Sequence, residues 1–174
     1  MGSQGEVQPA VHKAGKVMVW GGITSKGTTP LVFLKWDGTG MDAGDYQRQV
    51  IRLVARLLEQ DPFKVIMFMQ DNAPIHNART TKQLIERRGI EKFPEGNMAW
   101  PANSPDLNPI ENVWAWMKYR LAAMNEYPTT VEMMQEILNQ LWKEVTPEFC
   151  QRFTDGYRRR LEKVVAAQGY TTKY

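Results

Sequence analysis

The chain has 174 residues, of which 43% are hydrophobic and 10% aromatic, and its formal net charge is +3. This length and composition exclude a disordered or fibrous protein and predict one compact domain with a sizeable core. No apolar run approaches the roughly 20 residues of a membrane-spanning helix. We therefore expect no membrane partner. The single cysteine, Cys150, excludes an internal disulfide and a zinc site built on several thiolates, so we expect a reducing compartment.

The first elements along the chain are predicted to be a hairpin, a helix and a buried strand. Residues 1–15 are small and polar without a period, and we expect a flexible leader there. Two β-branched and aromatic runs, over 17–24 and 31–35, flank a six-residue connection and predict an antiparallel hairpin. Apolar residues at spacings of three and four predict an amphipathic helix over 42–60, and the continuous apolar run over 64–70 predicts a strand covered on both faces.

The rest of the chain is predicted to be mainly helical. A short strand over 90–93 and a loop over 94–109, rich in Pro and Asn, interrupt this part. The apolar period and the Gly and Pro boundaries predict helices over 77–88, 109–123, 130–145 and 147–168. This order of elements predicts a mixed α/β fold in which helices cover a sheet.

Asp71 is the first candidate functional residue. It lies in the stretch MQDNAPIH, where the predicted strand over 64–70 stops at a carboxylate. Ligands gather beyond the C-terminal ends of strands in such sheets, and a carboxylate fixed there suits a hard cation such as Mg²⁺. The alternative is a simple turn, in which Asp71 accepts hydrogen bonds from nearby backbone N–H groups.

Glu111 is the second candidate, in the stretch WPANSPDLNPIENVW. Asn108 is a good N-cap and Pro109 a good first helical residue, so Glu111 falls at the N3 position of a capping box. The first turn of a helix is also a rigid base from which Glu111 could reach a metal ion held by Asp71. The two roles are compatible.

Together these stretches resemble the catalytic core of mariner-type transposases, members of the DDE group with a ribonuclease-H-like fold. QDNAPIH is followed about forty residues later by WPANSPDLNPIENVW, and the upstream KVMVWGGITSKGTTPLVFL is similar to the second and third strands of that core. The resemblance covers roughly residues 16–121. It implies one domain, with a partial ribonuclease-H-like core over 16–123 and a helical extension of that core over 124–174.

The resemblance also implies a chemistry. Asp71 matches the second acidic residue of the family and Glu111 the third. In the family, three carboxylates bind two Mg²⁺ or Mn²⁺ ions, which activate a water or a DNA 3′-hydroxyl for in-line attack on a phosphodiester. The implied function is metal-dependent cleavage and transfer of DNA strands at transposon ends, with transposon-end and target DNA as partners and no small-molecule substrate. The implied location is the nucleus in a eukaryote and the cytoplasm otherwise.

The chain departs from the family pattern at the first catalytic aspartate. The family places this residue on a central strand well before the match to residues 17–24, and here the preceding fifteen residues carry a single acidic side chain, Glu6. We therefore expect poor DNA cleavage by this chain alone. We also expect that the strands over 17–24 and 64–70 either pair directly or borrow a strand from a second copy, which favours a homodimer. The alternative function is a host-adopted, non-catalytic remnant that binds DNA or protein.

Three further residues are candidates for orienting the carboxylates or the substrate: Asn72, His76 and Asn108. A hydrogen-bonded structural role in the turn is the alternative for His76. The basic side chains of Arg79 and Lys82, on the helix predicted over 77–88, are candidates for contacts with DNA. The last 25 residues hold six basic and two acidic side chains, with Arg158, Arg159 and Arg160 at their centre. A solvated helix surface is the alternative for both basic groups.

Overall fold

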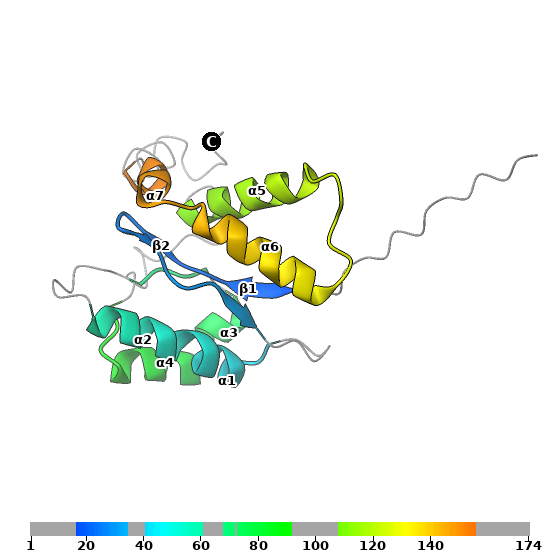
Figure 1. Cartoon of the computed structure of the whole chain (residues 1–174). Coiled ribbons are helices and arrows are strands. Elements are labelled where there is room, and N and C mark those ends of the chain that lie inside the picture. Colours follow the sequence, from blue (N-terminus) through cyan, green and yellow to red (C-terminus); the bar gives the residue numbers. More distant parts are fainter. Residues whose placement is uncertain (1–16, 35–40, 61–67, 72, 92–107, 156–174) are drawn as a thin grey trace, which may run out of the picture.

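The computed structural model describes residues 17–34, 41–60, 68–71, 73–91 and 108–155. Within these ranges, a narrow antiparallel β-ribbon lies between two helical layers (Figure 1). None of the described helices combines the length and the apolar character required to cross a membrane. The predicted leader over 1–15 lies outside the described residues, as does the extension beyond residue 155.

Two short antiparallel pairs form the ribbon: β1 (Met18–Trp20) with β4 (Val32–Leu34), and β2 (Ile23–Thr24) with β3 (Gly27–Thr28). Gly22 joins the pairs, because its N–H donates to Thr29 Oγ1 and its carbonyl accepts from Thr29 N, both at 2.8 Å. A Cβ on Gly21 would lie 2.7 Å from the ring of Trp142. The absence of a side chain at Gly21 therefore lets the ribbon backbone approach the helical layer closely.

The predicted hairpin is confirmed, but its predicted six-residue connection is wrong. The turn consists of Ser25 and Lys26 alone, because the next two residues form β3. Gly27 makes this tight turn possible with a φ of +122°, a conformation that strains other residues. The Thr24 hydroxyl adds a local bond by accepting from Lys26 N at 3.1 Å.

One helical layer comes from the chain between the ribbon and the candidate Asp71 turn, and from the helices after that turn. Its elements are α1 (Ala43–Tyr46), the π-helix η1 (Gln47–Ile51), α2 (Arg52–Glu59), α3 (Pro74–Asn77) and α4 (Arg79–Arg87). The first three are contiguous and confirm the predicted helix over 42–60, with an unpredicted π segment. The helix predicted over 77–88 starts later, because Ala78 is extended and separates α3 from α4.

The other helical layer contains the C-terminal described elements, shown in yellow-green to orange in Figure 1: α5 (Pro109–Ala122), α6 (Val131–Lys143) and α7 (Pro147–Thr154). Proline occupies the first position of α5 and of α7, where its missing N–H costs nothing. Each of α6 and α7 has a threonine N-cap whose hydroxyl accepts the backbone N–H three residues later. Thr130 accepts from Met133 N, and Thr146 accepts from Phe149 N. The predicted helices are therefore confirmed as far as the described residues extend.

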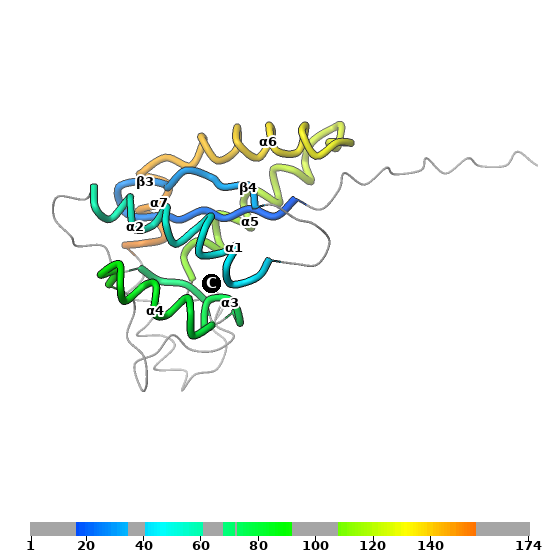
Figure 2. Tube along the Cα trace, turned by 90° about the horizontal axis from the view of Figure 1, so that it is seen from below, coloured from blue at the N-terminus to red at the C-terminus, as the bar shows by residue number. Residues whose placement is uncertain are grey.

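A hydrophobic core lies on each side of the ribbon. Alternate ribbon side chains serve the two cores: Val19 and Phe33 pack on one side, and Trp20 and Leu34 on the other. The first core contains Val113, Met117, Met134, Leu138, Leu141, Trp142, Val145 and Cys150, and the second contains Tyr46, Val50, Ile51, Val54, Ala55, Ile85 and Ile90. Figure 2 shows the ribbon between the helices that supply these cores. The sheet is thus covered on both faces.

The strand predicted over 64–70 is described only from Phe68 onward, and the one predicted over 90–93 only at its first two residues. Phe68 N donates to Glu91 O at 2.7 Å, so the two segments lie side by side. No strand pairing joins β1 to residues 68–71 in the described part of the chain. Direct pairing of these strands, one of the two arrangements expected from the sequence, is therefore not present there.

Candidate functional site

Asp71 lies immediately after the 68–70 segment and points largely into solvent, with 61% of its side chain exposed. Its Oδ1 accepts two hydrogen bonds, from His76 Nδ1 at 2.6 Å and from Ala73 N at 3.0 Å. Oδ2 accepts none from the described residues. The turn interpretation is therefore confirmed, and it coexists with a carboxylate oxygen that is still available to a ligand.

His76 is the side chain that holds Asp71. It lies in α3, and only 16% of its side chain is exposed. Its Nδ1 also lies 3.3 Å from the backbone oxygen of Asp71. A neutral ring that donates from Nδ1 keeps an acceptor at Nε2, whereas a protonated ring donates from both nitrogens. His76 thus fixes one oxygen of the carboxylate and ties α3 to the end of the preceding segment.

Behind His76 lie two residues that the sequence reasoning missed, Tyr46 and Gln70. The Tyr46 ring is 1% exposed and lies 4.4 Å from the His76 ring, centroid to centroid. Its hydroxyl donates to Gln70 Oε1 at 2.6 Å, and Gln70 Nε2 donates to the backbone oxygen of His76 at 3.5 Å. Tyr46 precedes the buried Val50 by four residues, so the helical period could have placed it on the same buried face.

The electrostatics of Tyr46 keep it a donor. Burial, and next the negative charge of Asp71, raise the pKa of the Tyr46 hydroxyl well above its ordinary value. The hydroxyl therefore stays protonated at neutral pH and continues to donate to Gln70. Asp71, His76, Gln70 and Tyr46 form one connected set, which we call the Asp71 network.

Glu111 is positioned differently, on the exposed first turn of α5. Its backbone N–H donates to Asn108 O at 3.1 Å, but the Asn108 side chain makes no capping bond. The predicted capping box is therefore not formed. The helix backbone fixes where Glu111 stands, and no hydrogen bond from a described residue fixes its carboxylate.

Both carboxylates line one cavity of about 550 Å³, together with His76 and Asn108. The remaining walls are mostly apolar and come from β1, from α2 and from the 68–70 segment, for example Val19, Leu57 and Phe68. We call this space the carboxylate cleft. The structure thus brings together four of the predicted site residues, from two segments almost forty residues apart in the chain: Asp71 and His76 from one, and Asn108 and Glu111 from the other.

The donor set of the cleft suits a hard divalent cation. Carboxylate oxygens are the ligands that Mg²⁺ prefers, and Mn²⁺ accepts the same donors. Among the described residues, no group of three or more His, Cys, Asp or Glu side chains is arranged to hold a metal ion. Asp71 and Glu111 are the two predicted carboxylates that line the cleft, and they could supply oxygen ligands to such an ion.

The other predicted site residues lie elsewhere. Arg79 is exposed at the start of α4 and Lys82 is half-buried one turn later, and neither lines the carboxylate cleft. Asn72, Arg158, Arg159 and Arg160 lie outside the described residues. Their predicted roles stay predictions.

This chain has clear matches among known protein families and curated proteins. Residues 2–135 match the family model of the DDE superfamily endonucleases. The chain is 32% identical over 161 residues to the Tc3 transposase of Caenorhabditis elegans, an alignment that covers 92% of this chain and 46% of the relative. The chain spans about half the length of the curated relatives it matches.

Solved structures give the same result. The catalytic domain of Mos1 transposase, determined with raltegravir and Mg, has a TM-score of 0.73 and 28% identity, covering 90% of this chain and 76% of that one. A Mos1 paired-end complex with the left transposon end has a TM-score of 0.72 and 26% identity, covering 99% of this chain and 51% of that one. The expected ribonuclease-H-like fold is therefore confirmed.

Proposed function

Because this chain belongs to the DDE superfamily endonucleases, we propose that it is the catalytic core of a Tc1/mariner-type transposase that cleaves and joins DNA strands at transposon ends. The observation that carries the proposal is the meeting of Asp71 and Glu111 in one cleft. The relatives and structural neighbours are transposases, and some of those structures contain Mg, Mn or a transposon end.

Four residues of the cleft have a part in the proposed mechanism. Asp71 and Glu111 would hold divalent metal. When bound, such ions stabilise the attacking and leaving oxygens at a phosphodiester. His76 keeps Asp71 Oδ1 hydrogen-bonded, so the carboxylate presents its second oxygen without having to reorient. Asn108 lies at the cleft wall beside Glu111 and is positioned to bind a phosphate oxygen or a water.

We further propose that two carboxylates are too few for efficient cleavage, since a two-metal site needs more oxygen ligands to fix both ions. Pure chain mixed with supercoiled DNA and Mg²⁺ is expected to nick the DNA only marginally. Efficient nicking that is lost in Asp71→Asn would show that the site is complete as it stands.

A homodimer is the proposed arrangement that could complete the fold. Among the described strands β1 pairs only with β4, so its other edge has no described partner, and an open edge is a template for an added strand. Light scattering over a range of protein concentrations is expected to show a dimer. A monodisperse monomer throughout that range would exclude the borrowed strand.

Metal binding tests the proposed site directly. We expect Mn²⁺ titrations followed by electron paramagnetic resonance to show a bound fraction that Asp71→Asn and Glu111→Gln each abolish. Glu132→Gln is the matched control, because Glu132 also lies in the first turn of a helix but outside the cleft. Equal Mn²⁺ binding by all four proteins would contradict a metal site and favour the non-catalytic remnant.

A further inference from the structure

We propose that a second hollow of the molecule, lined by Arg52, Arg56 and Arg88, binds backbone phosphates of duplex DNA. This groove has a volume of about 300 Å³ and shares no residue with the carboxylate cleft. We call it the arginine groove. The inference rests on the proposed function, because it assigns a second contact surface to the same DNA.

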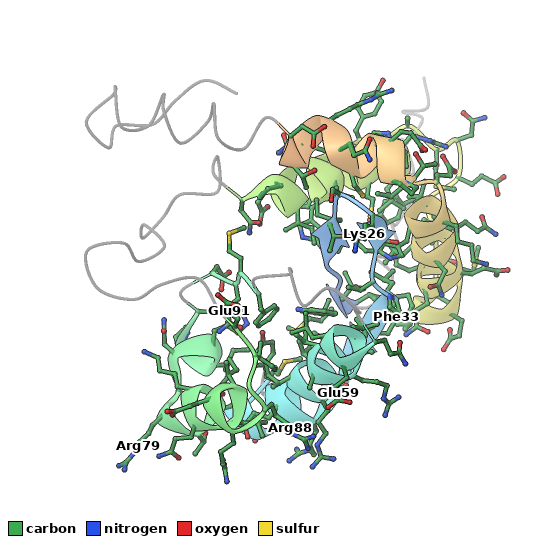
Figure 3. The ribbon with its side chains drawn as sticks, turned by 90° about the vertical axis from the view of Figure 1, so that its left-hand side faces the viewer. Lys26, Phe33, Glu59, Arg79, Arg88 and Glu91 are labelled. Carbon is green, nitrogen blue, oxygen red and sulfur yellow. The ribbon has the colours of Figure 1, made fainter. Side chains whose placement is uncertain are left out.

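The arginine groove lies on the side of α2 that faces away from the cleft. Arg52, Arg56 and Glu59 recur along α2 at spacings of four and three, so they share one helix face, while Val54, Leu57 and Leu58 line the cleft. Arg88 comes from the C-terminal cap of α4. Figure 3 shows Arg88 and Glu59 at the same end of the two helices, with Arg79 at the far end of α4.

The charges of the groove are unbalanced. Three guanidinium groups meet one carboxylate, and none of the three makes an ion pair within the described part of the chain. Two arginines elsewhere among the described residues do make ion pairs: Arg48 with Asp45 and Arg120 with Glu144, each at 2.6 Å. Like charges gathered at a hollow repel one another, and a bound anion relieves that repulsion.

The geometry favours a chain of phosphates over a single small anion. Arg52 and Arg56 stand one helical turn apart, roughly 6 Å between their Cβ atoms, and so present two separate cationic points on one ridge. Arg88 adds a third from the neighbouring helix. Guanidinium groups bind phosphate in a bidentate manner, and several of them along one surface match a polyanion.

Salt dependence of DNA binding tests the groove. The assay measures binding of a fluorescent duplex by anisotropy in EDTA, between about 50 and 200 mM salt, so metal binding plays no part. The slope of log K against log salt is negative, and each lost phosphate contact reduces its magnitude by about 0.9. We expect that reduction for Arg52→Ala, Arg56→Ala and Arg88→Ala, and an unchanged slope for Arg56→Lys, which keeps the charge.

Arg48→Ala is the matched control, since Arg48 lies one turn before Arg52 but is already paired with Asp45. Its slope should stay at the parent value, and thermal melts should show that all variants are folded. Parent-like slopes for the three groove variants, or an equal loss for Arg48→Ala, would overturn the proposal. Mn²⁺ binding is measured separately on the same variants. Groove variants that lose slope but keep Mn²⁺ binding, or a parent chain that binds DNA without binding Mn²⁺, make failure of the groove and failure of the metal site distinguishable.

Discussion

Asp71 and Glu111 line the same cleft, but the protein holds them by opposite means. The Asp71 carboxylate is fixed by hydrogen bonds from His76 and from Ala73 N, and the buried Tyr46 lies behind His76. Glu111 is fixed only through the backbone of α5, and its exposed carboxylate has no hydrogen-bond donor among the described residues. In the proposed metal site, the Asp71 carboxylate would therefore be organised in advance, whereas the Glu111 side chain would adapt to the bound ion.

Removing the buried Tyr46 side chain, which lies behind His76, should cause the largest loss of stability. Tyr46→Ala leaves a cavity in a fully buried position, and we expect a loss of about 3 to 5 kcal/mol in the free energy of unfolding. Chemical denaturation measures this loss. Tyr119→Ala, at a tyrosine that is 71% exposed, should change the stability by less than about 0.5 kcal/mol. Equal losses of unfolding free energy in the two variants would show that the buried Tyr46 ring stabilises the fold no more than an exposed tyrosine does.

Removing the direct contact should weaken metal binding without unfolding the protein. His76→Ala frees the Asp71 carboxylate, and we expect Mn²⁺ affinity to fall at least about tenfold, as for other residues that orient a metal ligand. His76→Asn places an amide near the position of Nδ1 and should restore part of the affinity. If His76→Ala bound Mn²⁺ as tightly as the parent, the proposed pre-organisation of Asp71 would be wrong.

The stability of the protein at alkaline pH should depend on the buried Tyr46 hydroxyl. The pKa of Tyr46 is raised in the folded protein, while the unfolded chain ionises near pH 10. The protonated Tyr46 hydroxyl therefore makes its full contribution to the free energy of unfolding below about pH 10. As the pH rises further, this contribution declines by up to about 1.4 kcal/mol per pH unit. Urea titrations of the parent and of Tyr46→Phe should diverge in that alkaline range. Parallel curves would contradict a buried, un-ionised Tyr46.

The smallest expected effect concerns the hydroxyl of Tyr46 at neutral pH. Tyr46→Phe keeps the ring against His76 but leaves Gln70 Oε1 without its donor. We expect a loss of about 1 kcal/mol in unfolding free energy, with a much smaller change in Mn²⁺ affinity than His76→Ala gives. A larger metal defect in Tyr46→Phe than in His76→Ala would reverse the proposed order of support.

Much of the site was predictable from local sequence signals. Asp71 follows an apolar strand run, and Asn108 with Pro109 marks the helix that carries Glu111, so both carboxylates could be placed on their elements. Their meeting in one cleft followed from the resemblance of the two motifs to a known core. The ribbon was predictable as a hairpin, but the two-residue turn was not, because it depends on the positive φ of Gly27.

The Asp71 network was not predictable in the same way. The Tyr46 hydroxyl and Gln70 are 24 residues apart in the chain, and periodicity shows that a tyrosine is buried without showing which polar atom satisfies it. The arginine groove has the same origin. Arg52 and Arg56 are visible as a pair on one helix, but the approach of Arg88 depends on how α4 packs beside α2.

In the proposed function, Asp71 and Glu111 share one divalent metal site. Paramagnetic broadening of backbone amide signals by Mn²⁺, measured by NMR on the unmodified protein, tests it most directly. If the site is shared, amides near Ala73 and near Asn112 should broaden together, with one apparent Kd, before any signal in α6. Broadening near Ala73 alone, or first at other acidic surfaces such as Glu132, would contradict a shared site.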